Sequence, residues 1–433
     1  MRTASLLLLL LPTQALAQPA PALQLQPLSG EILISVSDVA SRLRPAVAAD
    51  RAGRFVVAWR EIEGQDGGIA GRRLSTTGQP ASPGFVIAPR ETGLHTSDPR
   101  IVARSDGGFL VAWGDAAFLR PGCARARSFS PSLGDTAEPA GDVFALGDCT
   151  MENGRAPEVA LAGLPDGRFT AAWESGQAMA PMPPTSAGGF TVLVRQFSST
   201  GVPLAEALGA AEPKEGGPGA GEQTAPAVTV HADGGTFVLW LDRLRAALLG
   251  RRFDAGGQPL GPAFRVDTGG FPVQAAVAAS LSGRSVVAWS AFSGQEMQIV
   301  AQLFDAGGRK HGGPVAVSAS ALRSDSVRGP RDPDIALDAA GNFIVVWAAD
   351  QADGAGTDVL GRLFDSDGIP QGPPFQINLT RPGSQGHPAV AFGRDDHFLV
   401  VWESQKNANA RGSIVGRLYL ALRAVVPSLR RNE

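Results

Sequence analysis

The 433-residue chain has little charge and few chemically versatile side chains. It contains one Tyr, two Cys and five His, and its 38 basic residues nearly balance 41 acidic ones, so the net charge is −3. Because there is no basic field, the composition gives no support for binding to nucleic acid or to anionic lipid. Charged residues make up only 18% of the chain and hydrophobic residues 44%, which excludes the composition of a disordered protein.

Apolar runs long enough to cross a membrane are also absent. The leucine run Leu6–Leu11 follows Arg2 and precedes the small-residue sequence Ala15-Leu16-Ala17. This order of a basic residue, a short apolar run and an Ala-x-Ala site is typical of a secretory signal peptide. We therefore predict a signal peptide at residues 1–17, cleaved near Ala17, and a linker at residues 18–29. The mature chain is expected to be secreted or periplasmic, without a transmembrane segment.

The two cysteines, Cys123 and Cys149, bear on the same question. In an exported protein a disulfide is favoured over a catalytic thiol, because the surroundings are oxidising and the number of cysteines is even. We predict a disulfide between them.

Gly and Pro, by contrast, are abundant, at 54 and 33 residues, and the Trp residues recur at intervals of about 50 to 60 residues. Each Trp ends an apolar run such as Phe55–Trp59 or Phe343–Trp347, and a turn Gly precedes this run in every repeat but the last. We interpret each repeat as four short strands, with the Trp on the second. The Trp residues, which we assign to the core, are Trp59, Trp113, Trp173, Trp240, Trp289, Trp347 and Trp402.

Four short antiparallel strands repeated seven times predict an all-β fold, namely a seven-bladed β-propeller over residues 30–426. The last repeat lacks a clear fourth strand, whereas residues 31–36 resemble a fourth strand that precedes the first repeat. We predict that residues 31–36 pair into the seventh blade and close the ring, because closure removes exposed sheet edges. Residues 427–433 are expected to form a C-terminal tail.

The repeat motif begins with Pro, continues with a turn Gly and Phe-x-Val-x-Trp, and ends with a Gly-Arg-Leu-Phe-Asp strand such as Gly361–Asp365 and an x-x-Gly-x-Pro turn. This motif resembles the tandem repeats of exported bacterial β-propeller proteins, and the resemblance covers nearly the whole mature chain. It implies a propeller fold and an export route. It implies little chemistry, because that family has no clear assigned activity and one fold serves many functions.

Propeller topology separates two faces of the molecule. The turns between the first and second strands, and between the third and fourth, are short and uniform. The loops from the second to the third strand and the connections between repeats are long and irregular. Variable loops on a rigid scaffold usually carry function. We therefore expect binding on the variable face, where both cysteines are also expected.

The side chains on this face that could bind a ligand or take part in catalysis fall into two groups. Acidic residues follow the Trp strands, and Asp-Pro or His-Pro pairs begin the innermost strands, which approach the central channel. Solvated strand ends and turn initiation explain these patterns equally well. We assign no catalytic residue. The candidate ligand-binding residues are Asp98, Arg155, Glu174, Arg331, Asp332, His387 and Glu403.

A separate segment, with Asp350, Asp353 and Asp358, combines spaced carboxylates with glycines in a pattern that suits calcium. It lacks the full ligand number of a recognised calcium loop. We therefore assign no metal site and expect no cofactor, with calcium as the one candidate.

These observations favour an exported, non-enzymatic, monomeric β-propeller that binds a protein, peptide or glycan through its variable face. No P-loop, dinucleotide fingerprint or nucleophile motif occurs in the sequence. The alternative is an envelope hydrolase or lyase with carboxylates and arginines at the mouth of the central channel. A third hypothesis is a structural surface protein without a discrete ligand.

Overall fold

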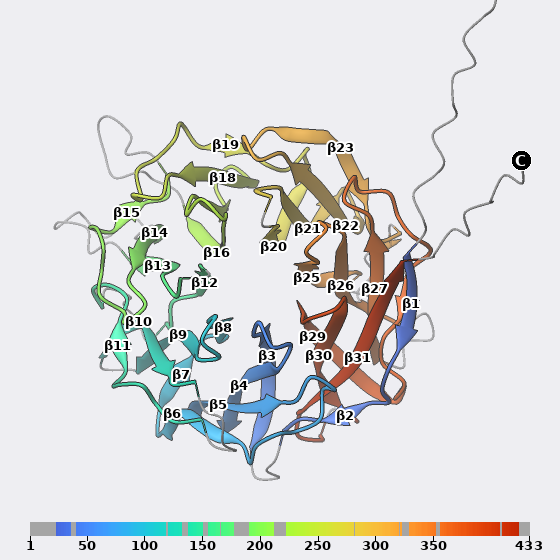
Figure 1. Ribbon diagram of the computed structural model, residues 1–433, viewed down its shortest axis with the longest axis horizontal. Helices are drawn as coiled ribbons and strands as arrows, with labels where there is room; N and C mark the ends of the chain where they lie inside the picture. The colour runs from blue at the N-terminus through green and yellow to red at the C-terminus, as the bar shows by residue number, and fades with distance from the viewer. Residues whose placement is uncertain are drawn as a thin grey trace, which may run out of the picture.

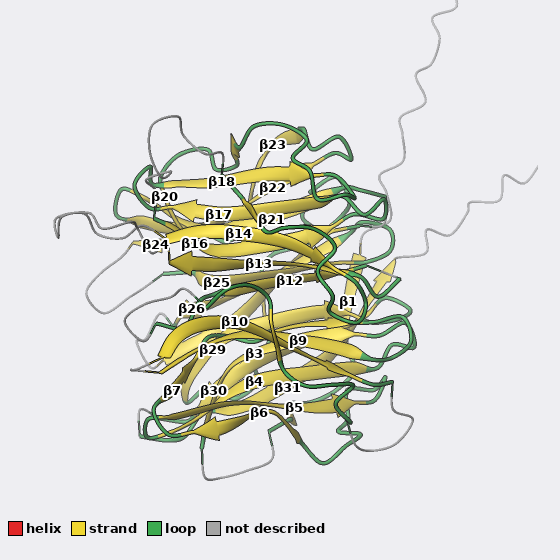
Figure 2. Cartoon of the chain, turned by 90° about the vertical axis from the view of Figure 1, so that its left-hand side faces the viewer, coloured by secondary structure: helices red, strands yellow, loops and turns green. Residues whose placement is uncertain are grey.

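The structure, a computed structural model, describes residues 23–35, 40–117, 120–131, 137–149, 155–164, 166–176, 190–211, 222–280, 282–319, 321–322, 329–351, 356–407 and 409–423. Within these ranges all of the regular secondary structure consists of β-strands, so the predicted all-β fold is confirmed. None of the described segments forms a helix able to cross a membrane. The sheets form a ring around a central space (Figure 1), and their strands run along the axis of that ring (Figure 2).

Five sheets follow one another along the chain. The first contains β3 (Ser41–Ala49), β4 (Phe55–Glu63), β5 (Asp66–Leu74) and β6 (Phe85–Glu91). The second contains β7 (Leu94–Thr96), β8 (Arg100–Ala103), β9 (Phe109–Ala117), β10 (Arg120–Phe129) and β11 (Phe144–Ala145). The third contains β12 (Val159–Gly163), β13 (Phe169–Gly176), β14 (Phe190–Phe197) and β15 (Leu208–Gly209).

The fourth sheet contains β16 (Gln223–Val230), β17 (Thr236–Asp242), β18 (Ala247–Phe253) and β19 (Phe264–Arg265). The fifth contains β20 (Phe271–Ala279), β21 (Ser285–Ser293), β22 (Glu296–Phe304), β23 (Lys310–Ala316) and β24 (Ala321–Leu322).

The last sheet has nine strands, because a short parallel contact between two of them, at Gly356 and Gly383, joins two groups of strands. The first group contains β25 (Arg331–Leu337), β26 (Phe343–Asp350), β27 (Gly356–Phe364) and β28 (Phe375–Gln376). The second contains β29 (Gly383–Phe392), β30 (His397–Gln405), β31 (Ser413–Arg423), β1 (Leu23–Pro27) and β2 (Ile32–Leu33).

The core lies between neighbouring sheets, and each tryptophan strand supplies its centre. All seven Trp side chains are at most 1% exposed. Trp59 on β4, for example, packs against Val401 on β30 and Ile414 on β31. The turn before the strand depends on glycine: Gly53 has a φ of 81°, a left-handed conformation that disfavours other residues. Apolar strand faces and permissive turns therefore place the innermost strands, which begin each repeat, around the axis.

Arginine side chains on the third strands join neighbouring sheets. Arg127 Nη1 on β10 donates a hydrogen bond to Ile87 O of the preceding sheet at 3.0 Å. Arg72 Nη1 on β5 donates in the same way to Ile34 O, also at 3.0 Å. Ile34 is thus equivalent to Ile87: each supplies the carbonyl oxygen that accepts a hydrogen bond from the arginine on the third strand of the following sheet.

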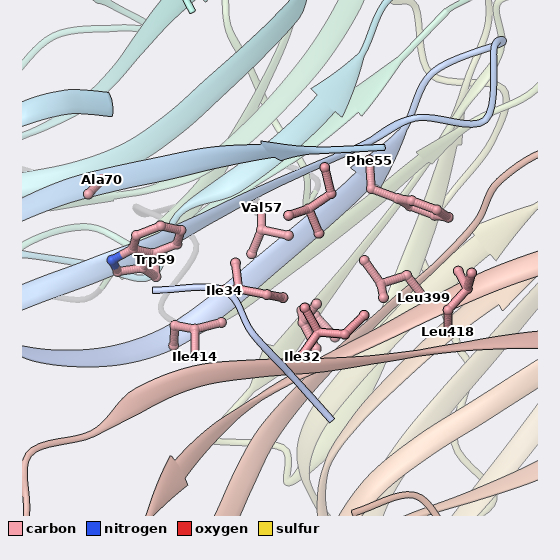
Figure 3. Packing of buried hydrophobic residues seen from close by; sticks show 12 residues of the cluster. Ile32, Ile34, Phe55, Val57, Trp59, Ala70, Leu399, Ile414 and Leu418 are labelled. Carbon is pink, nitrogen blue, oxygen red and sulfur yellow. The ribbon is translucent and has the colours of Figure 1, made fainter. Parts of the chain in front are cut away.

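The segment around Ile34 pairs with the far end of the chain. Ile32 lies opposite Gly416 on β31, and the Ile34 N–H donates to Ile414 O at 2.9 Å. Ile34 is fully buried, in a cluster that includes Ile32, Trp59 and Leu418 (Figure 3). Val36, which the sequence assigned to the same strand, lies outside the described residues, as do the predicted signal peptide and the tail at residues 427–433.

The predicted linker at residues 18–29 differs from the structure in part. Within it, Leu23–Pro27 form β1, which pairs antiparallel with β31. The alternation of Leu and Gln in this segment explains the strand, because Leu23 is buried while the intervening glutamines are not.

Cys123 on β10 and Cys149 form the predicted disulfide, with Cα atoms 4.4 Å apart. The bond is consistent with an extracellular or periplasmic protein.

Candidate functional site

A cavity of ≈ 570 Å³ lies at the end of the central channel where the innermost strands begin. Among its lining residues are three of the sequence candidates, Asp98, Asp332 and His387. A second cavity of ≈ 500 Å³ occupies the other end of the channel, and none of the candidates lines it. We therefore take the first cavity as the candidate site.

The backbone is strained where several innermost strands enter this cavity. Arg44, Ala225, Asp332 and His387 have φ values of 54°, 52°, 52° and 48°, and each directly precedes a proline. Residues before proline normally adopt an extended conformation, and left-handed residues other than glycine are uncommon. Such a conformation costs on the order of 1–3 kcal/mol per residue and is found mainly at functional sites. The pairing register shifts around all four positions, so each strand is locally bulged.

Asp332 and His387 form the chemical centre of the cavity. His387 Nδ1 lies 2.9 Å from Asp332 Oδ2 in an ion-pair contact, and neither atom makes a hydrogen bond among the described residues. Gln274 fixes the same aspartate on its other side, because Gln274 Nε2 donates to Oδ1 at 2.6 Å and Gln274 Oε1 accepts the Asp332 N–H at 2.9 Å. Burial raises the pKa of Asp332, but His387, Gln274 and Arg44 together bring that pKa down to about 2. Asp332 is thus an ionised carboxylate that faces an imidazole.

Arg44 spans the mouth of the cavity between two carboxylates. Its Nη1 lies 3.6 Å from Asp98 Oδ2 and 3.9 Å from Asp332 Oδ1. The two oxygens are therefore at most 7.5 Å apart. Asp98 also accepts a hydrogen bond from Arg60 Nη1 at 3.3 Å. The Arg44 side chain, 37% exposed, makes these two ion pairs but no hydrogen bond within the described part of the chain, and it lines the cavity.

Glu174 and Glu403, two further candidates, do not line the cavity but brace its wall. Glu174 Oε1 accepts the N–H of Ala225 at 3.1 Å and thus fixes a left-handed residue of the next repeat. The N–H of Arg44, another left-handed residue, faces Glu403 and acts to lower the pKa of that carboxyl group. Burial raises the pKa of Glu403, as expected for a carboxyl group behind the wall.

The remaining candidates also lie away from the cavity. Arg155 Nη2 donates to Glu174 Oε2 at 2.8 Å, and Arg331 Nη1 donates to Asp350 Oδ1 at 2.7 Å. Asp358, from the calcium candidate, accepts hydrogen bonds from Gln351 and Asn378. Asp353 lies outside the described residues, within which no cluster of three potential metal ligands occurs.

Two residues of the site were missed in the sequence. Arg44 occupies the same position before proline as Asp332 and His387, so the Arg44-Pro45 pair carried the same signal as Asp332-Pro333. Gln274 carried none, because it follows a proline by two positions and its partner Asp332 lies on another repeat.

The brace at Glu174 makes stability depend on pH. Burial, and then the neighbouring Glu158 carboxylate, raise the pKa of Glu174 from 4.5 to about 7. The folded state thus binds this proton more tightly than the unfolded state, so the contribution of Glu174 to stability is complete below 4.5 and is lost as the pH rises through about 7.

We expect Glu174→Gln to reduce the loss of stability between about pH 4.5 and pH 8, because the amide cannot lose a proton. Urea unfolding of both proteins across this range measures the difference. An unchanged pH dependence in the variant would contradict the raised pKa of Glu174.

No family model matches the chain, and no curated protein matches its sequence. Solved structures match the chain in fold. A protein of unknown function from Dyadobacter fermentans is 12% identical, with a TM-score of 0.51 over 92% of this chain and 99% of that one. An ulvan lyase bound to -[GlcA(1-4)Rha3S]- is 11% identical, with a TM-score of 0.49 over 90% and 94%. An α-L-arabinofuranosidase from Lactobacillus brevis is 13% identical, with a TM-score of 0.40 over 80% and 98%. These neighbours have propeller-like folds, and at such identities they show the fold alone.

The comparison corrects the main functional hypothesis drawn from the sequence. That hypothesis, a non-enzymatic binding protein, is wrong: neighbours with a stated activity include arabinofuranosidases, a polysaccharide lyase and a sialidase. The alternative, an envelope hydrolase or lyase, agrees better with them. The sequence contains no contiguous catalytic motif, and the residues that line the cavity come from several repeats.

Proposed function

We propose that the chain is an exported glycan-cleaving enzyme that acts on uronate-containing polysaccharides by β-elimination. The observation that carries this proposal is one arrangement in the cavity: an imidazole beside an ionised carboxylate, next to a partly exposed arginine whose contacts with two carboxylates are ion pairs longer than hydrogen bonds. Proton abstraction next to a carboxylate requires these two functions, a base and a cation that stabilises the developing negative charge.

Arg44 supplies the cation. A guanidinium binds a carboxylate through two parallel N–H···O bonds, and such charge-assisted pairs are stronger than neutral ones. Arg44 lines the cavity beside Asp98 and Asp332. A substrate uronate group bound there loses part of its charge, which makes the hydrogen on the adjacent ring carbon, C5, more acidic.

His387 supplies the base. With Asp332 ionised, the imidazole carries its proton on Nδ1, toward Asp332, and leaves Nε2 free to accept one. Nε2 takes the C5 proton, the C4–O bond breaks, and a double bond forms between C4 and C5. The leaving oxygen takes up a proton, delivered by the imidazolium directly or through water, so no water is consumed overall and no cofactor is needed.

Hydrolysis is the second candidate, favoured by the spacing of Asp98 and Asp332. Their oxygens are at most 7.5 Å apart, which permits the separations that glycosidase carboxyl pairs use. Asp332 is held ionised, so Asp98 would have to act as the acid.

The proposal includes a ring of seven blades, each with one of the Trp strands. Closure by residues 31–36 is supported by the equivalence of Ile34 and Ile87 as acceptors for Arg72 and Arg127. The blades would hold residues of β3, β25 and β29 at one mouth. Export after cleavage near Ala17 would place this mouth in contact with envelope or extracellular polysaccharide.

The test is incubation of the purified mature chain with polygalacturonate, polymannuronate and a glucuronate-containing polysaccharide, with dextran as the neutral control. We expect at least one polyuronate to yield products with the ultraviolet absorbance of an unsaturated uronate, and dextran to yield none. New reducing ends without this absorbance would favour hydrolysis. No cleavage of any polyuronate would overturn the proposal.

A further inference from the structure

Asp98 lies at the edge of the cavity between two arginines of the preceding repeat. Its Oδ1 accepts a hydrogen bond from Arg60 at 3.3 Å, whereas its Oδ2 stands 3.6 Å from Arg44 Nη1. The contact with Arg60 is thus a hydrogen bond, and the contact with Arg44 is a longer ion pair. The Asp98 and Arg44 side chains are 31% and 37% exposed, so both are accessible from the cavity.

We propose that Asp98 occupies, in the free protein, the place on Arg44 that an anionic sugar group takes, and thereby sets the affinity for anionic glycans. This inference rests on the proposed role of Arg44 as the group that binds the substrate carboxylate. Asp98 is then a specificity-determining residue: it competes with the substrate and takes no part in proton transfer.

The other carboxylate beside Arg44 is unsuited to this exchange. Asp332 is only 10% exposed, and it is held by two hydrogen bonds with Gln274 and by His387. Asp332 cannot turn away from Arg44 without breaking its hydrogen bonds with Gln274, which is costly for a buried charge. Asp98 is more exposed and keeps its hydrogen bond with Arg60 when Arg44 turns away. Of the two contacts of Arg44, the one with Asp98 is the shorter, but it is also the one that can be released at low cost.

The exchange favours anions over neutral sugars for an electrostatic reason. A substrate carboxylate can form two short charge-assisted hydrogen bonds with Arg44, in place of one long ion pair. A neutral sugar offers no such compensation, so Arg44 keeps its contact with Asp98.

Asp98→Asn tests the competition. The amide keeps an acceptor for Arg60 but loses its charge, so we expect KM for the cleaved polyuronate to fall roughly two- to five-fold, as the loss of a partly exposed ion pair implies. Asp98→Glu restores the carboxylate and is expected to restore KM toward the wild-type value. The matched control is Glu158→Gln, which removes the same charge from the same cavity but is not an ion-pair partner of Arg44 within the described residues, and is expected to change KM less.

A binding experiment separates this inference from the proposed reaction. Retardation in gels that contain polygalacturonate or dextran is measured for His387→Ala alone and combined with Asp98→Asn. Stronger retardation of the double variant in polygalacturonate, but not in dextran, supports the competition even if the wild-type chain cleaves no polyuronate. Equal or weaker retardation overturns it, even if cleavage is observed. Thermal unfolding of each variant shows whether it remains folded.

Discussion

His387→Ala is expected to lower kcat for polyuronate cleavage by roughly 10²- to 10⁴-fold, the usual contribution of a general base. Among the described residues that line the cavity, His387 is the one imidazole, and an ionised carboxylate lies 2.9 Å from its Nδ1. Binding should change little, because Arg44 and Asp98 remain in place. Initial rates, followed by the absorbance of the unsaturated product, give kcat and KM for the comparison.

His95→Ala is the control for this substitution. His95 is an exposed histidine on β7 that does not line the cavity, so its loss should leave kcat within about twofold of wild type. Asp332→Asn should lower kcat as well, because the amide removes the charge that orients His387 and stabilises its protonated form. A His387→Ala enzyme with undiminished kcat would rule out the imidazole as the base.

Ile34→Ala is expected to lower the free energy of unfolding by about 2–5 kcal/mol, the cost of emptying a buried isoleucine site. Ile34 is fully buried between the first sheet and β31, among residues of both ends of the chain (Figure 3). Leu33→Ala is the matched control: its side chain is 60% exposed, so its replacement should change stability by less than about 0.5 kcal/mol. Urea unfolding at one pH measures both.

The same pair of variants tests ring closure. If residues 31–36 hold the two ends of the chain together, deletion of residues 30–37 should lower the unfolding temperature far more than removal of residues 430–433. Similar small losses for Ile34→Ala, for Leu33→Ala and for both deletions would contradict closure.

The fold could be predicted from the sequence because its signal is repeated. Each repeat has the same apolar strand ending in Trp, and nearly every repeat has the same turn glycine. A departure from the motif in one repeat therefore does not prevent the assignment of its strands. The segment Leu23–Pro27 was missed because it occurs once, and its pairing with β31 depends on a partner nearly 400 positions away in the sequence.

The site could be predicted only in part. The pairs Asp332-Pro333 and His387-Pro388 marked residues that do line the cavity, because each pair lies at the bulge where an innermost strand enters it. Glu174 and Glu403 carried an equally regular pattern, yet they face backbone N–H groups of other repeats. Sequence alone cannot distinguish these cases, since the difference lies in which neighbour each carboxylate faces across a sheet interface.

The most direct test of the proposed reaction is the mass of the products released from polyuronates by the wild-type chain and by His387→Ala. We expect the wild-type products to be lighter by one water than the corresponding hydrolysis products, and we expect the variant to release almost none. Wild-type products with the mass of hydrolysis products, or equal yields from both proteins, would contradict elimination with His387 as the base.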